Sequence, residues 1–118
     1  MNYLQATQEI SVALPEICND LQQTRIQNSY HIIGFLTDKV KTMIRQNNTT
    51  CLFKCLGKMN ELYSDGDEMI KNAIENSFVY SLDSCTAFSG QEYRDLIFSH
   101  LSPALQEVYV RQIYSHNI

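Results

Sequence analysis

The sequence predicts an all-α protein, and three observations support this fold class. Apolar residues recur at intervals of three and four positions along most of the chain, which places them on one face of a helix. Only four glycines and two prolines interrupt the 118 residues. The one Asp-Gly pair, at residues 65–66, lies between helical patterns and not between alternating apolar runs, so hairpins are not indicated. We therefore expect six or seven short helices and no strands.

The length is that of one domain of ordinary size, so residues 1–118 are predicted to form a single helical domain. Short helices can bury their apolar sides only against one another, either in an irregular bundle or in a short array of stacked helical hairpins. No repeat of roughly 30 to 45 residues is evident, but such repeats diverge readily. Both architectures stay open at this point.

The first half of the chain divides into four helical segments. A helix is expected over roughly residues 2–12, and Pro15 suits the first turn of a second one, which runs to about residue 23. Asn28 can cap the longest pattern, which ends at residues 47–49, and these can cap a fourth helix over residues 50–63. The apolar stripes of the last two are Tyr30, Ile33, Leu36, Val40, Met43 and Ile44, and Leu52, Phe53, Leu56, Met59 and Tyr63.

A central helix is expected over roughly residues 67–82, and its regular apolar stripe predicts a place in the middle of the core. Asp65 and Glu68 are expected to act as a capping-box-like pair at its start, with Gly66 in the turn. The stripe consists of Ile70, Ala73, Ile74, Ser77, Phe78, Ser81 and Leu82. The starts of the last two helices are predicted by Ser89 with Glu92, and by Ser102 with Pro103.

Cys51 and Cys55 stand four positions apart and raise the question of a metal site. A structural zinc site needs four ligands, usually in two close pairs, and here the remaining cysteines and histidines are scattered. The acidic stretch at residues 65–68 lacks the ligand spacing of a calcium loop. We therefore expect no metal, and interpret both thiols as buried or half-buried structural groups.

No motif selects catalytic residues. The sequence has no G-x-S-x-G, no H-E-x-x-H, no phosphate-binding glycine loop and no dinucleotide fingerprint. His31 lies within a helical pattern and is interpreted as a packed or rim histidine. The sequence thus predicts a protein that is not an enzyme and has no cofactor. A deep pocket in which a histidine meets a cysteine or a carboxylate would reopen the question.

Charge is distributed unevenly along the chain. The formal net charge is −4, but residues 1–60 carry six basic and four acidic side chains, whereas residues 61–118 carry three and nine. An acidic protein with a pI near 5.2 is not typical of nucleic-acid binding. The segment 39–58, in which all charged side chains are basic, nevertheless keeps a nucleic-acid-binding regulator as the alternative. It would act through Lys41, Arg45, Lys54 and Lys58.

The feature most suggestive of function is a second stripe on the central helix, which mixes amides, acids and an aromatic residue. Such a face can dock a protein, because the aromatic residue supplies anchoring area and the acids attract a basic surface. A plain solvated face is the competing interpretation. Together with the acids before the helix, the predicted partner face consists of Asp65, Asp67, Glu68, Asn72, Glu75, Asn76, Tyr80 and Asp83.

The sequence also favours a cytoplasmic location. No apolar run approaches the roughly 20 residues that cross a bilayer, and the first residues lack a basic segment followed by an apolar one. Four cysteines without a secretion signal fit reduced thiols better than a disulfide framework. No membrane association is expected.

The segment IKNAIENSFVYSLDS, followed after a short gap by YRDLIFSHLSPALQEVY, resembles a family of small all-helical bacterial domains of unknown function. In that family a central helix precedes a final helix opened by a Leu-x-Pro-like turn, which here is Leu101-Ser102-Pro103. In size, charge and lack of catalytic motifs the chain also resembles the immunity proteins that bacteria encode beside contact-dependent or secreted toxins. This second resemblance implies a protein that binds a basic toxin domain, often a nuclease, and blocks its active site or its substrate path.

Overall fold

The computed structural model describes residues 1–87 and 89–116, with side chains as far as residue 114. All regular structure in these residues is helical, which confirms the predicted fold class. The helices of the first half are α1 (Tyr3–Ala13), the 3₁₀ turn η1 (Pro15–Ile17), α2 (Cys18–Gln22), α3 (Ser29–Arg45) and α4 (Thr49–Asp65). Those of the second half are α5 (Glu68–Ala73), the π-helical segment η2 (Ile74–Val79), α6 (Tyr80–Cys85), α7 (Gln91–Ser99) and α8 (Pro103–His116).

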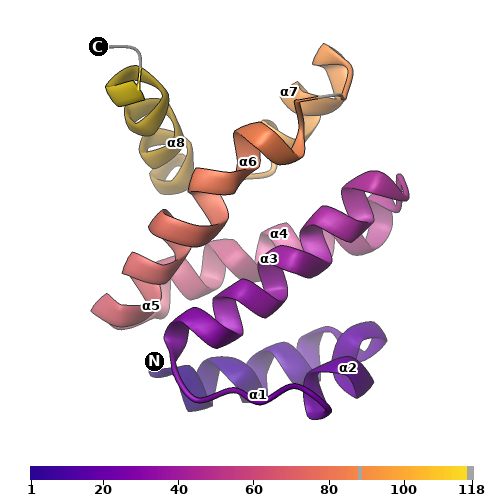
Figure 1. Ribbon diagram of the computed structural model, residues 1–118, viewed down its shortest axis with the longest axis vertical. Coiled ribbons are helices and arrows are strands. Elements are labelled where there is room, and N and C mark those ends of the chain that lie inside the picture. The colour runs from indigo at the N-terminus through magenta and orange to yellow at the C-terminus, as the bar shows by residue number, and fades with distance from the viewer. Residues whose placement is uncertain (88, 117–118) are drawn as a thin grey trace.

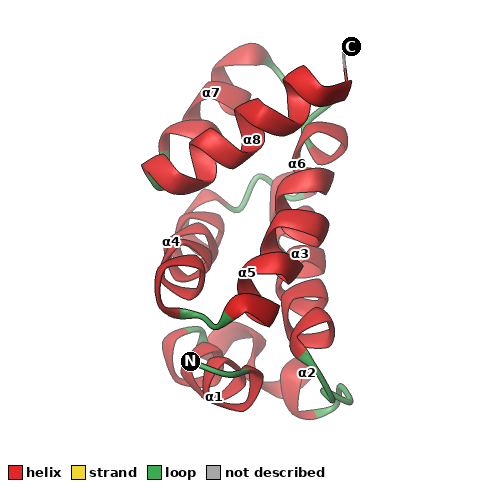
Figure 2. Ribbon diagram, turned by 90° about the vertical axis from the view of Figure 1, so that its left-hand side faces the viewer, coloured by secondary structure: helices red, strands yellow, loops and turns green. Residues whose placement is uncertain are grey.

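The segments α5, η2 and α6 follow one another without a break and form the central helix (Figure 1). Its neighbours are α3, α4 and α8, so it packs on helices from both halves of the chain, as in an irregular bundle. Figure 2 shows α1 and α2 at one end of the long axis, α7 and α8 at the other, and α3, α4 and α5 between them. The molecule measures 37 × 30 × 21 Å.

The core surrounds the central helix, as the sequence predicts, but the buried residues differ from the expected stripe after Ile74. Ser77 and Ser81 are only half-buried, whereas Val79 and Thr86 are buried. The π-helical segment explains the difference, because its wider turn contains one extra residue and advances everything after it by one position. The buried residues of this helix and its C-cap are Ile70, Ala73, Ile74, Phe78, Val79, Leu82 and Thr86.

The stripes of α3 and α4 are largely confirmed, with one shift in each helix. On α3, Ile32 is fully buried, whereas Tyr30 is 42% exposed. On α4, Leu62 is fully buried and Tyr63 is half-buried. Both tyrosines lie at the edges of their stripes, where their hydroxyls bond side chains of the central helix, and the Tyr63 ring also packs against the core.

Side-chain caps begin most of the longer helices. Asn2, Asn28, Asn48 and Asp67 each accept a hydrogen bond from the backbone N–H three residues later. At the end of α3, the Asn47 and Asn48 N–H groups donate to the Ile44 and Met43 carbonyls. This is the Schellman arrangement, and it accounts for the positive φ of 54° at Asn47.

Two predicted caps are wrong. Asp65 is the last residue of α4, and Asp67, not an Asp65–Glu68 pair, accepts from Ile70 N–H at 3.0 Å. The reason is that α5 begins at Glu68, which places its free first-turn amides within reach of residue 67. Helix α7 likewise begins one residue later than a Ser89 cap requires, and its N-cap, Gly90, offers no side chain.

Asn60 on α4 connects the middle of the bundle to the turn between α7 and α8. Its Nδ2 donates to the His100 carbonyl at 2.9 Å, and its Oδ1 accepts from Ser102 N–H at 2.9 Å. The Ser102 hydroxyl in turn accepts from Leu105 N–H and caps α8, as predicted. The half-buried Asn60 amide therefore supplies hydrogen-bond partners for the His100 carbonyl and the Ser102 N–H of this turn.

Replacing Asn60 with alanine is expected to lower the free energy of unfolding by about 1–3 kcal/mol, because a half-buried N–H and a half-buried carbonyl lose their partners. Urea denaturation followed by circular dichroism measures the effect. Asn72→Ala is the matched control, since this amide is exposed on α5 and its loss should cost less than about 0.5 kcal/mol. Equal stability of the two variants would show that water replaces the Asn60 bonds.

Candidate functional site

The predicted partner face follows the α4–α5 turn and the outer side of the central helix. The other sides of this helix are covered by α3, α4 and α8. Glu68, Asn72 and Asn76 are exposed, and Tyr80 is 61% exposed. Asp65 is also exposed, at the end of α4. The structure therefore brings these five side chains to the surface along one continuous stretch of chain.

Several predicted residues also form contacts within the protein, and Asn76 donates to the Tyr30 hydroxyl at 3.3 Å. Asp67 caps α5. Glu75 accepts a hydrogen bond of 2.7 Å from the Tyr63 hydroxyl. Asp83 forms an ion pair of 2.7 Å with Arg94 and accepts from the Tyr109 hydroxyl at 3.1 Å. The Glu75 and Asp83 carboxylates thus connect the central helix to its neighbours, whereas Asp67 stabilises the start of its own helix, and both aspartates remain exposed.

These contacts change the acidity of the two phenols. Burial and the hydrogen bond to Glu75 raise the pKa of Tyr63 to about 12. Burial, with the nearby Asp83 carboxylate, also raises the pKa of Tyr109. Both hydroxyls therefore keep their protons at neutral pH and remain donors to the two carboxylates.

A shallow groove of about 320 Å³ runs along the partner face between the central helix and α8. Tyr80 lines it together with Gln112 of α8, which donates to the Glu75 carbonyl at 2.9 Å. The groove is lined by Val79, Tyr80, Asp83, Ser84, Tyr109, Gln112 and Ile113. Aromatic and polar groups thus lie next to the exposed side of the helix.

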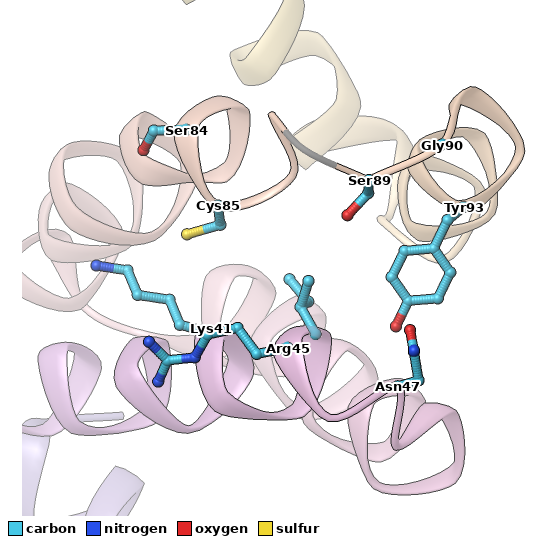
Figure 3. Close-up of a pocket in the computed structure, with 9 residues that line it drawn as sticks. Lys41, Arg45, Asn47, Ser84, Cys85, Ser89, Gly90 and Tyr93 are labelled. Atoms are coloured by element: carbon cyan, nitrogen blue, oxygen red, sulfur yellow. The ribbon is translucent and has the colours of Figure 1, made fainter.

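A larger open cleft, of about 730 Å³, separates the second half of α3 from α6 and the start of α7 (Figure 3). Sequence reasoning did not find it, because it joins residues 41–47 to residues 84–93 and no motif connects the two segments. It is lined by Lys41, Ile44, Arg45, Asn47, Ser84, Cys85, Ser89, Gly90 and Tyr93.

The basic segment does not form one surface. Lys54 pairs with Glu16 at 3.1 Å, and Lys58 pairs with Glu9 and Glu61 at 3.0 and 2.9 Å. These two lysines therefore face α1 and η1. Lys41 and Arg45 line the cleft on another side of the bundle, and neither has a carboxylate within 4 Å among the described residues.

The thiols occupy the structural positions expected of them. Cys55 is fully buried, its Sγ lies 3.6 Å from the Met43 sulfur, and burial raises the pKa of its thiol to about 12. Cys51 is half-buried, with its Sγ 3.8 Å from a Glu16 carboxylate oxygen. No group of three potential metal ligands occurs among the described residues.

The histidines have structural contacts. His31 is exposed at the start of α3, where its Nδ1 accepts from Gln27 N–H at 3.1 Å. The ring of His100, which the sequence did not single out, stacks on Phe53 with centroids 3.8 Å apart. No spacing rule would have paired these two residues, which lie 47 positions apart on α4 and after α7.

The comparisons with known proteins give one match. Residues 7–115 match the family described as Domain of unknown function (DUF7674). No curated protein and no solved structure matches significantly. Within the part of the chain that the structure describes, no helix has the length and apolar character of a membrane span.

Proposed function

The chain belongs to the DUF7674 family of domains of unknown function, and we propose that it is a non-enzymatic module that binds and neutralises a basic protein, as bacterial immunity proteins do. Its docking surface is the exposed part of the partner face, together with the groove beside α8. The cytoplasm is the compartment in which such a protein would meet its partner.

The observation that supports this proposal is the uncovered outer side of the central helix. Three neighbours cover the rest of the helix, yet Tyr80 is 61% exposed and lines a groove. Large aromatic side chains that stand beside a concavity are frequent anchors of protein interfaces. The exposed amides of Asn72 and Asn76 lie on the same helix and can supply the polar contacts of such an interface.

Electrostatics favours a basic partner. Asp65 and Glu68 are exposed at one end of the surface, and neither forms an ion pair among the described residues. Both belong to the half of the chain with a balance of −6. Such a field accelerates the approach of a basic protein more than it tightens the final complex.

The nucleic-acid alternative draws less support from the geometry. It requires a basic surface that tracks phosphates, and Lys54 and Lys58 are neutralised by Glu9, Glu16 and Glu61. Lys41 and Arg45 remain as an isolated pair of cations in a cleft.

The first experiment is co-expression and co-purification with the product of the adjacent gene. We expect that product to harm cells that lack this protein and to form a complex with it. If the product neither binds nor harms such cells, the immunity proposal fails.

The second experiment maps the surface. Tyr80→Ala is expected to weaken the complex by about tenfold or more, as the loss of an anchoring aromatic residue does. Glu68→Lys is expected to slow association at low salt and to have little effect at high salt. Surface plasmon resonance at two ionic strengths measures both effects.

Two control variants carry the same types of substitution outside the proposed docking surface. Leu4→Ala removes an exposed apolar side chain from α1, and Glu92→Lys reverses an exposed charge on α7. Both should leave the kinetics unchanged, and thermal denaturation verifies that all four variants fold. If the controls weaken the complex as much as Tyr80→Ala and Glu68→Lys do, the interface does not lie on the central helix.

A further inference from the structure

The open cleft between α3 and α6–α7 contains two cations that form no ion pair among the described residues. Lys41 and Arg45 lie one turn apart on the same side of α3, and both side chains line the cleft. Five ion pairs occupy Lys39, Lys54, Lys58 and Arg94, but none within the described residues includes Lys41 or Arg45. Two adjacent cations held without a carboxylate repel each other, and an anion bound between them removes that cost.

The opposite wall of the cleft supplies neutral hydrogen-bonding groups. In Figure 3 the Lys41 and Arg45 side chains extend from α3 beneath Cys85 of α6, and Ser89 points its hydroxyl into the space from above. Burial raises the pKa of the Cys85 thiol, Lys41 and Arg45 act to lower it, and the Asp38 carboxylate opposes them, so this thiol lies within the field of the two cations. Ser84 adds a second hydroxyl.

The other end of the cleft is less polar and contains an unsatisfied group. Ile44 is among the lining residues. In Figure 3 the Tyr93 ring reaches from α7 toward Asn47. The Tyr93 hydroxyl oxygen is buried and has no hydrogen-bond partner among the described residues. Burying a hydroxyl without a partner costs free energy, so such groups in a native protein call for an explanation. A ligand group in the cleft would provide that partner once the ring turns its hydroxyl toward the cleft.

The cleft thus offers cations and hydroxyls at one end and an aliphatic side chain with an aromatic ring at the other. Its volume of about 730 Å³ lies within the usual range of small-molecule sites. We propose that it binds a phosphate ester of mononucleotide size, with the phosphate between Lys41 and Arg45 and the base or another flat ring against Ile44 and Tyr93. None of these four residues belongs to the partner face, so a test of this site is independent of the tests of the proposed function.

The proposal is tested by isothermal titration calorimetry of the full chain with adenosine monophosphate, inorganic phosphate, adenosine and a single-stranded oligonucleotide. We expect the mononucleotide to bind more tightly than inorganic phosphate, and adenosine to bind far more weakly than either. Removing one cation, by Lys41→Gln or Arg45→Gln, should weaken binding of the mononucleotide about tenfold or more, because each charge-assisted bond is lost. Lys54→Gln, a lysine of the same basic segment that faces η1, is the matched control and should leave affinity unchanged.

Tyr93→Phe separates binding from folding. The substitution keeps the ring and removes a hydroxyl that has no partner among the described residues, so the melting temperature should stay the same or rise. Affinity for the mononucleotide should fall, because the ligand loses that hydrogen bond. A lower melting temperature with unchanged affinity would assign the hydroxyl to the fold and overturn its role in the site.

Three other results would overturn the proposal. The first is the absence of mononucleotide binding up to about 1 mM, the upper end of ordinary metabolite affinities. The second is undiminished binding in the two cation variants. The third is tighter, strongly salt-dependent binding of the oligonucleotide, which would favour a nucleic-acid site in the same cleft.

Discussion

Deletion of Ser77 is expected to leave the protein folded, whereas deletion of Asp38 is expected to unfold it. Ser77 lies in the π-helical segment, where the helix contains one residue more than a regular turn holds. Removing it converts the segment to α-helix and preserves the order of buried residues. Phe78, Val79 and Leu82 then follow Ile74 at the spacings of three and four that a regular helix needs.

Asp38 is exposed, whereas Ser77 is half-buried, but Asp38 lies in regular α-helix. Its removal rotates the rest of α3 by one position, which turns Val40, Met43 and Ile44 away from the core. Each buried side chain of this size contributes about 1.5–3 kcal/mol. The three contributions together reach about 5 kcal/mol, which is the lower end of the free energy of unfolding of a domain.

Circular dichroism and urea denaturation distinguish the two deletions. The Ser77 deletion should keep the helical spectrum and change the free energy of unfolding by no more than about 1–2 kcal/mol. The Asp38 deletion should lose the cooperative transition. If both deletions unfold the protein, the wide turn is a required part of the core and not an insertion that the helix tolerates.

Replacing Gly66 with alanine is expected to lower the free energy of unfolding by about 1–3 kcal/mol, the usual cost of forcing an extra group into a packed site. A Cβ at this position would lie 2.4 Å from the Leu62 carbonyl oxygen and 2.6 Å from Ile70 Cγ2. The Gly66 φ angle is −72°, so the loss arises from the close approach and not from backbone conformation. Because Gly66 N–H also donates to that Leu62 carbonyl at 2.8 Å, relief of the contact disturbs the end of α4.

Gly57→Ala is the matched control within the same helix. No atom lies within 4 Å of a Cβ built there, and the residue is exposed in the interior of α4. Alanine should stabilise the protein by about 0.5–1 kcal/mol, because glycine is a poor helix former. Thermal denaturation should show a lower melting temperature for Gly66→Ala and a higher one for Gly57→Ala. A Gly66→Ala protein as stable as the wild type would show that the α4–α5 turn relaxes freely.

Periodicity and local capping chemistry were sufficient to predict the helical class and most helix positions. Asn28 and Ser102 cap helices where the sequence placed them, because a side-chain cap acts within three residues and leaves a local signature. The central helix was also expected in the core. Whether residues 1–118 are one domain stays a prediction, although one family covers nearly all of them.

The remaining features depend on geometry that local patterns do not contain. The π-helical turn moved Val79 into the core, since an extra residue in a helix has no sequence signal of its own. Of the predicted partner face, Glu75 and Asp83 turned out to bond Tyr63 and Arg94, which come from other helices. The α3 cleft was missed for the same reason, because Lys41 and Tyr93 are 52 positions apart.

The two hydrogen bonds of Asn60 hold the α7–α8 turn against α4 at one end of the molecule. Helix α7 has one buried side chain, Ile97, and beyond it this helix is attached to the bundle mainly through the Arg94–Asp83 ion pair and the turn that Asn60 bonds. Segments attached in this way open locally before the rest of a protein unfolds. Amide hydrogens of α7 should therefore exchange with solvent sooner than those of α3, and a ligand that bridges Lys41 and Tyr93 should slow that exchange.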